Sequence, residues 1–165
     1  MIRVAASRDL PSLAQLMACS PLLERYRTTY DGALASLRKA VASDDLVLVH
    51  GEPPAGFAWL TFAPRMLNGA AYLRLLLVAA PGHGTGAALL EAAEARAQVQ
   101  ARHLYLLVTT DNLSARRFYE RHGYRHVGDL PGLVWPDLDE ALYHKPLRAA
   151  GANGSDRERE RGTSG

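Results

Sequence analysis

The chain has 165 residues, which suits one domain with a sizeable core. It is 48% hydrophobic and 22% charged, as ordinary soluble globular proteins are. Its net charge of +2 is too small to indicate a nucleic-acid-binding surface. No stretch approaches the roughly 18 apolar residues of a membrane span, and Arg3, Arg8 and Asp9 interrupt any signal peptide. Because Cys19 is the only cysteine, no internal disulfide or cysteine metal cluster is expected, and we predict a cytoplasmic protein without nucleic-acid or membrane partners.

Hydrophobic periodicity predicts the elements of the first half in chain order. They are a strand over 2–6, a helix over 7–19, a helical region over 22–43 broken near Asp31-Gly32, and strands over 45–51, 56–64 and 70–80. The second half continues with a helix over 84–99, a strand over 103–110, a helix over 112–123, a strand over 124–130, a loop over 131–137 and a strand over 140–147. This order predicts an α/β (α+β) domain with a single mixed, mostly antiparallel sheet of about seven strands and helices on both faces.

The end of the chain differs in composition from the rest. Residues 149–165, "AAGANGSDRERERGTSG", contain no apolar residue larger than alanine, so they cannot bury enough surface to fold. We therefore assign residues 1–148 to the domain and predict a disordered tail over 149–165.

A glycine-rich loop lies between the strand over 70–80 and the next helix. In "VAAPGHGTGAALLEAAEARA", residues 78–97, glycines alternate at 82, 84 and 86. Such a loop is either a tight turn or an anion site, since glycines let a phosphate approach the free amides of a helix N-terminus. A nucleotide P-loop is absent. A dinucleotide fingerprint fits Gly82, Gly84 and Ala87, but Asp111 lies too far along the chain and too little sequence follows.

Three segments give a more specific indication: "PGHGTGAALLEAAE", "DNLSARRFYERHGY" and "DEALYHKPL". In order and spacing the chain resembles the GCN5-related N-acetyltransferase (GNAT) family over roughly residues 1–148. The resemblance implies acetyl-CoA as acyl donor and an N-acetyltransferase that moves the acetyl group to a small amine or peptide. No metal is expected, because Gly123 ends the helix between His122 and His126.

The resemblance also implies roles for individual residues. The amides of His83, Gly84, Thr85, Gly86 and Ala87 would hold the CoA pyrophosphate. The backbone of Leu76, Leu77 and Val78 would pair with the pantetheine arm and polarise the acetyl carbonyl. Asn112 and Phe118 would contact the pantetheine side, and Tyr119 would protonate the departing thiolate. Without the surrounding block, the pair Phe118-Tyr119 would indicate core packing alone.

Two features depart from the family pattern. Pro81 stands where many members carry Gln or Arg, so a side-chain contact to phosphate is missing. The strand over 70–80 has no carboxylate, although many members place a general base there. Either the base lies elsewhere, or the acceptor is an amine of low pKa, because an alkyl ammonium of pKa about 10.4 is mostly protonated at neutral pH.

The acceptor pocket is less well defined by the sequence. Tyr30, Arg74 and Trp135 are candidate substrate contacts, and each has packing or a solvated charge as its alternative. Arg74 in an apolar strand needs a partner, either a substrate carboxylate or an acidic residue of the fold. The missing base leaves a second function open, a non-catalytic acyl-CoA-binding or regulatory module. Members of the family often pair, so a homodimer is also an expectation.

Overall fold

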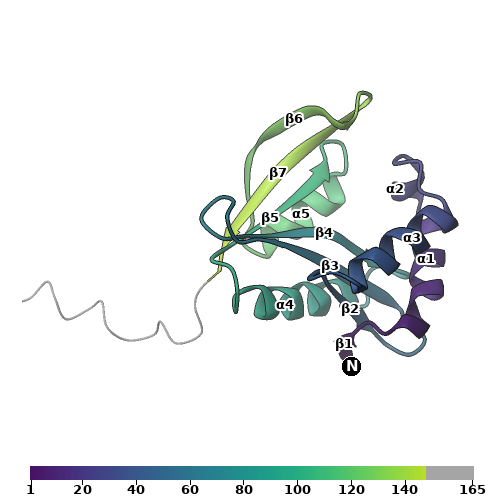
Figure 1. The fold of residues 1–165 in the computed structure, drawn as a ribbon. Coiled ribbons are helices and arrows are strands. Elements are labelled where there is room, and N and C mark those ends of the chain that lie inside the picture. The colour runs from purple at the N-terminus through teal and green to yellow at the C-terminus, as the bar shows by residue number, and fades with distance from the viewer. Residues whose placement is uncertain (148–165) are drawn as a thin grey trace, which may run out of the picture.

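The computed structural model describes residues 1–147, and its strands form one seven-stranded sheet in the order β1-β2-β3-β4-β5-β7-β6 (Figure 1). The strands are β1 (Ile2–Val4), β2 (Leu46–His50), β3 (Gly56–Ala63), β4 (Ala70–Val78), β5 (His103–Thr109), β6 (Arg125–Trp135) and β7 (Leu138–Pro146). A 3-10 turn (Ser7–Asp9) precedes the helices α1 (Leu10–Ala18), α2 (Pro21–Glu24), α3 (Tyr30–Val41), α4 (Thr85–Ala97) and α5 (Leu113–Arg121).

The strand pairing confirms the predicted mixed, mostly antiparallel sheet. Only β4 and β5 run parallel, and α4 forms the connection between them, as a parallel pair requires. The assignment of residues 1–148 to one domain stays a prediction. The tail predicted over 149–165 lies outside the described residues.

Helices cover both faces of the sheet because side chains alternate along its strands. In β2 and β3, Val49 and Phe57 pack with α1 and α3, whereas Leu48 and Ala58 pack with α4. Each face therefore has its own apolar core, and the sheet separates the two. No helix among residues 1–147 is long and apolar enough to cross a membrane.

Two predicted boundaries were wrong. The helical region over 22–43 breaks at residues 25–29 and not at Asp31-Gly32. Thr29 ends this break by accepting a hydrogen bond from the amide of Gly32 at 3.2 Å, so it is the cap from which α3 begins. The predicted loop over 131–137 is largely strand, since β6 continues to Trp135 and pairs there with Leu138.

Candidate active site

The site lies where β4 and β5 separate. The two strands pair only from Ala70 to Leu73 on β4 and from His103 to Leu106 on β5. Beyond these residues β4 pairs only with β3, and β5 only with β7. The β4 backbone from Leu75 to Val78 thus has an edge without a strand partner, and such an edge can hydrogen-bond an extended ligand.

A bulge in β4 stands at the point of separation. Leu73 pairs with Leu60 and Leu75 with Trp59 of β3, so Arg74 is an extra residue without a partner. The bulge turns the Arg74 side chain over the indole ring of Trp59, with 4.6 Å from the guanidinium carbon to the ring centroid. The sequence predicts Arg74 inside a buried strand, but at the bulge its side chain is exposed.

On one side of the separated strands is a cleft of about 500 Å³, which we call the cofactor cleft. Its lining comes from β4, the glycine loop and α5: Leu22, Leu76, Val78, Ala80, Pro81, Gly82, Gly84, Thr85, Gly86, Ala87, Asn112, Ser114, Ala115, Phe118, Tyr119 and Arg121. The structure thereby brings together most of the predicted cofactor-binding residues. Leu77 packs in the core on the other face, and His83 turns its ring to the Pro81 carbonyl at 3.1 Å.

The glycine loop presents open backbone to this cleft. Gly82 and Gly84 have φ of 89° and 77°, which non-glycine residues rarely adopt, and a Cβ on either would meet no atom within 4 Å. Within residues 1–147, none of the amides from Gly82 to Ala87 donates a hydrogen bond to the protein. None of the residues between 1 and 147 that line the cleft carries a carboxylate. Free amides at a helix N-terminus and the absence of negative charge suit an anionic group such as a pyrophosphate.

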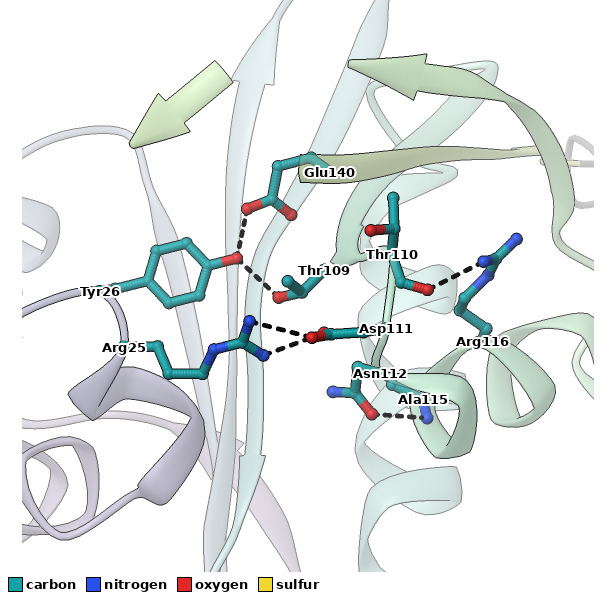
Figure 2. A network of polar contacts seen from close by, with 9 residues as sticks. All are labelled: Arg25, Tyr26, Thr109, Thr110, Asp111, Asn112, Ala115, Arg116 and Glu140. Carbon is teal, nitrogen blue, oxygen red and sulfur yellow. Dashed lines mark hydrogen bonds and ion pairs between the residues drawn. The ribbon is translucent and has the colours of Figure 1, made fainter. Parts of the chain in front are cut away.

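Helix α5 supplies the opposite wall. Asn112 caps it, and its side-chain oxygen accepts a hydrogen bond from the Ala115 amide at 3.1 Å (Figure 2). Asn112 also lines the cleft, and its side-chain NH2 group remains to face it. Phe118 approaches Gly86, which brings α5 close to the loop. Ser114 and Arg121 also line the cleft and were missed by the sequence reasoning, although their helical spacing from Phe118 was a usable signal.

Tyr119 lies between the cofactor cleft and a smaller cavity. It is 9% exposed, packs edge-on against Phe118 and Tyr124, and lines both spaces. Its hydroxyl has no hydrogen-bond partner among the described residues. Burial raises the pKa of this hydroxyl well above its usual value, so it keeps its proton.

We call the smaller space, about 160 Å³, the inner cavity. The carboxyl group of Glu140, at the start of β7, lies on it and is 2% exposed. The Tyr26 hydroxyl donates to Glu140 Oε1, so the Thr109 hydroxyl must donate to Tyr26 across 2.8 Å (Figure 2). Burial raises the pKa of Glu140, and the hydrogen bond from Tyr26 opposes that shift. Glu140 was not predicted from the sequence, although the absence of a carboxylate on β4 left a base elsewhere in the chain open.

Two further contacts hold this region together. Arg25 forms a two-pronged ion pair with Asp111, at 2.9 and 3.0 Å, and so joins the segment after α2 to the end of β5 (Figure 2). Arg116 donates to the Thr110 carbonyl at 2.9 Å and fixes the start of α5. Both contacts link segments that are far apart or irregular, and they set the positions of Tyr26 and Asn112.

A third space of about 440 Å³, the outer cavity, adjoins the inner one through Tyr26, Tyr72 and Arg74. Arg27 and Arg74 line it, and no carboxylate from the described part of the chain does. Arg27 stacks on Trp135, with 3.9 Å to the ring centroid, so Trp135 lies at this cavity's rim. Tyr30 is not brought to the site, since it lines a separate depression with Cys19.

The family comparison agrees with this geometry. Residues 12–124 match the model of the acetyltransferase (GNAT) family. No protein of curated function matches the sequence.

Solved structures match over nearly the whole chain. A ribosomal-protein-alanine N-acetyltransferase from Brucella melitensis has 20% identity and a TM-score of 0.74, covering 89% of this chain and 99% of its own. A putative acetyltransferase from Salmonella typhimurium, solved with its cofactor acetyl-CoA, has 20% identity and a TM-score of 0.70, covering 94% and 98%. At such identities these structures show a common fold. The family match over residues 12–124, on a fold whose strands separate beside a glycine loop, shows that the chain belongs to the GNAT acetyltransferase family.

Proposed function

We propose that this chain transfers the acetyl group of acetyl-CoA directly to an amine while both substrates are bound, with Tyr119 as general acid. The observation that carries the proposal is that Tyr119 lines both the cofactor cleft and the inner cavity. A group that protonates the leaving sulfur must stand where donor and acceptor meet, and must hold its proton until then.

Each part of the site has a task in this reaction. When bound, acetyl-CoA supplies a thioester whose carbonyl carbon is attacked by the amine. The glycine-loop amides bind its pyrophosphate, and the free β4 edge donates hydrogen bonds where negative charge develops on the carbonyl oxygen. Tyr119 donates its proton to sulfur as the carbon–sulfur bond breaks. Cys19 lies on a different depression, which favours direct transfer over a covalent acetyl-enzyme.

The test is release of CoA thiol from acetyl-CoA over a panel of amines, with the wild type and Tyr119→Phe. We expect Tyr119→Phe to lower kcat about 10²- to 10⁴-fold, as loss of a general acid does. Binding of acetyl-CoA, measured by calorimetry, should change little. Wild-type kinetics reproduced by the phenylalanine variant would exclude Tyr119 as the acid.

The alternative is a non-catalytic acyl-CoA-binding module. Its support was the missing carboxylate on β4, but Glu140 now offers a carboxylate in the inner cavity. Acetyl-CoA binding without thiol release from any amine would favour the module. The same assay with longer acyl-CoA donors would define the donor.

Location and partners are part of the proposal. We place the protein in the cytoplasm, with a small amine or a peptide as acceptor, and keep the homodimer as a prediction.

A further inference from the structure

We propose that the acceptor is a small amine with an anionic group a few bonds from its nitrogen, the nitrogen binding at Glu140 and the anionic group between Arg74 and Arg27. The inference rests on the proposed acetyl transfer and names the substrate class of the same site. It follows from how charge is divided between the inner and outer cavities.

The inner cavity has one negative group. Glu140 is its only lining carboxylate among residues 1–147, and it lies in the same cavity as Tyr119. Oε1 accepts from Tyr26, while Oε2 has no hydrogen-bond partner within the described residues. A nearly buried carboxylate with a free oxygen facing a cavity needs a donor from a ligand, and an ammonium group supplies one.

The outer cavity has the opposite charge. Arg27 and Arg74 both line it, and neither forms an ion pair with a carboxylate in the described part of the chain. Each guanidinium instead lies on an indole, Arg27 on Trp135 and Arg74 on Trp59. Stacking fixes the guanidinium plane while its N–H groups stay available, which suits binding of a carboxylate or phosphonate.

The two cavities that hold the charged groups adjoin each other. Tyr26, Tyr72, Leu75 and Arg74 are among the residues that line both cavities. Burial raises the pKa of the Tyr72 hydroxyl, the charge of Glu140 raises it further and that of Arg74 lowers it, so Tyr72 lies within the field of both charges. A single small molecule can therefore place its nitrogen at Glu140 and its anionic group at the arginines.

The reaction balances with these groups. The ammonium gives one proton to Glu140, and the free electron pair on nitrogen forms the bond to the acetyl carbon. The carbon–sulfur bond breaks with its electron pair on sulfur, which receives the proton of Tyr119. The nitrogen then releases its second proton, which restores Tyr119 through solvent, and Glu140 returns its own proton to solvent.

The test uses thiol release with ω-amino acids from glycine to 5-aminopentanoate, each paired with the alkyl amine of equal length. An aminoalkylphosphonate series distinguishes phosphonate from carboxylate as the anionic group. We expect one chain length to exceed its neutral counterpart in kcat/KM by about tenfold to a hundredfold, the range for one or two charge-assisted hydrogen bonds.

Arg74→Gln and Arg27→Gln should each reduce that anionic-to-neutral ratio about tenfold. Arg96→Gln, on exposed α4 surface away from all three cavities, is the matched control and should leave the ratio unchanged. Equal use of charged and neutral amines, or a ratio unaffected at Arg74 and Arg27, overturns the substrate class while acetyl transfer stands. No thiol release from any amine overturns both.

Discussion

The cofactor cleft and the acceptor side are built in different ways. The cofactor cleft is lined mainly by two continuous segments, the glycine loop and one face of α5, with further residues from β4, and its loop presents free backbone amides. The acceptor side is formed by side chains from five separate segments, which supply Tyr26, Arg74, Thr109, Trp135 and Glu140. A site that binds through main-chain amides tolerates side-chain substitutions around its glycines. A site that binds through side chains can change which ligand it binds with each substitution. The difference explains how one fold can keep a donor and vary its acceptor.

The largest effect that separates the two regions should come from Glu140→Gln. We expect kcat/KM for the amine to fall about 10²- to 10³-fold, as removal of a general base does. The KM for acetyl-CoA should stay within about twofold, because Glu140 does not line the cofactor cleft. Glu94→Gln is the matched control, since Glu94 also accepts a tyrosine hydrogen bond, from Tyr124, away from the cavities.

The dependence of kcat/KM on pH is a second measurement that tests Glu140→Gln. Glu140 must be ionised to accept a proton, and burial raises its pKa. Wild-type kcat/KM should therefore rise with pH through a pKa above that of an ordinary glutamate, and Glu140→Gln should lack this acidic limb. Tyr26, Thr109, Tyr72, Arg25 and Asp111 surround Glu140. Burial raises the pKa of Glu140, the hydrogen bond from Tyr26 and the charge of Arg25 lower it, and the charge of Asp111 raises it. An acidic limb that persists in the variant assigns the base to another group.

A smaller effect, on the donor alone, is expected from Gly84→Ala. Its φ of 77° strains an L-residue, and the added methyl would enter the open cleft. We expect the KM for acetyl-CoA to rise about tenfold, a change of about 1.4 kcal/mol, with the amine KM unaffected. Gly69→Ala is a close control because Gly69 also has positive φ and empty surroundings, outside the cleft. Equal KM values for acetyl-CoA in the two variants would mean that the substitutions act through backbone strain alone. They would then give no support to binding of the pyrophosphate by the glycine loop.

The smallest effect tests whether side chains assist the backbone in the cofactor cleft. Arg121 is exposed at the cleft wall, where it can compensate for the side chain that Pro81 lacks. Arg121→Gln should raise the KM for acetyl-CoA about two- to fivefold, and less at high salt, as expected for a solvent-exposed charge pair. Arg117→Gln, on the same helix but outside the cleft, should change neither the KM for acetyl-CoA nor its dependence on salt.

The sequence predicted the cofactor cleft better than the acceptor side. Strands, glycine loop and α5 depend on local pattern, so their order and most of their residues were predictable. Glu140 was missed because its hydrogen-bond partner Tyr26 is 114 positions away, and Thr109, which lies opposite it in the sheet, is 31 positions away, so no local pattern records these contacts. The predicted substrate contact Tyr30 was wrong: the chain turns at Arg27, whose φ is 58°, and Tyr30 at the start of α3 lines a separate depression with Cys19.

The bulge at Arg74 has a consequence for the apolar pattern of β4. Ala71 and Leu73 lie on the α4 face, and after the bulge Leu76 and Val78 lie on that face, so the odd-even phase of the strand shifts by one. A deletion of Arg74 would restore uninterrupted alternation and leave every leucine in its present core. Arg74 is therefore an insertion that the core does not require. A strand one residue shorter would keep the same apolar pattern and would leave Arg27 as the only arginine lining the outer cavity among residues 1–147. We therefore expect length variation at this position to change which ligand that cavity binds.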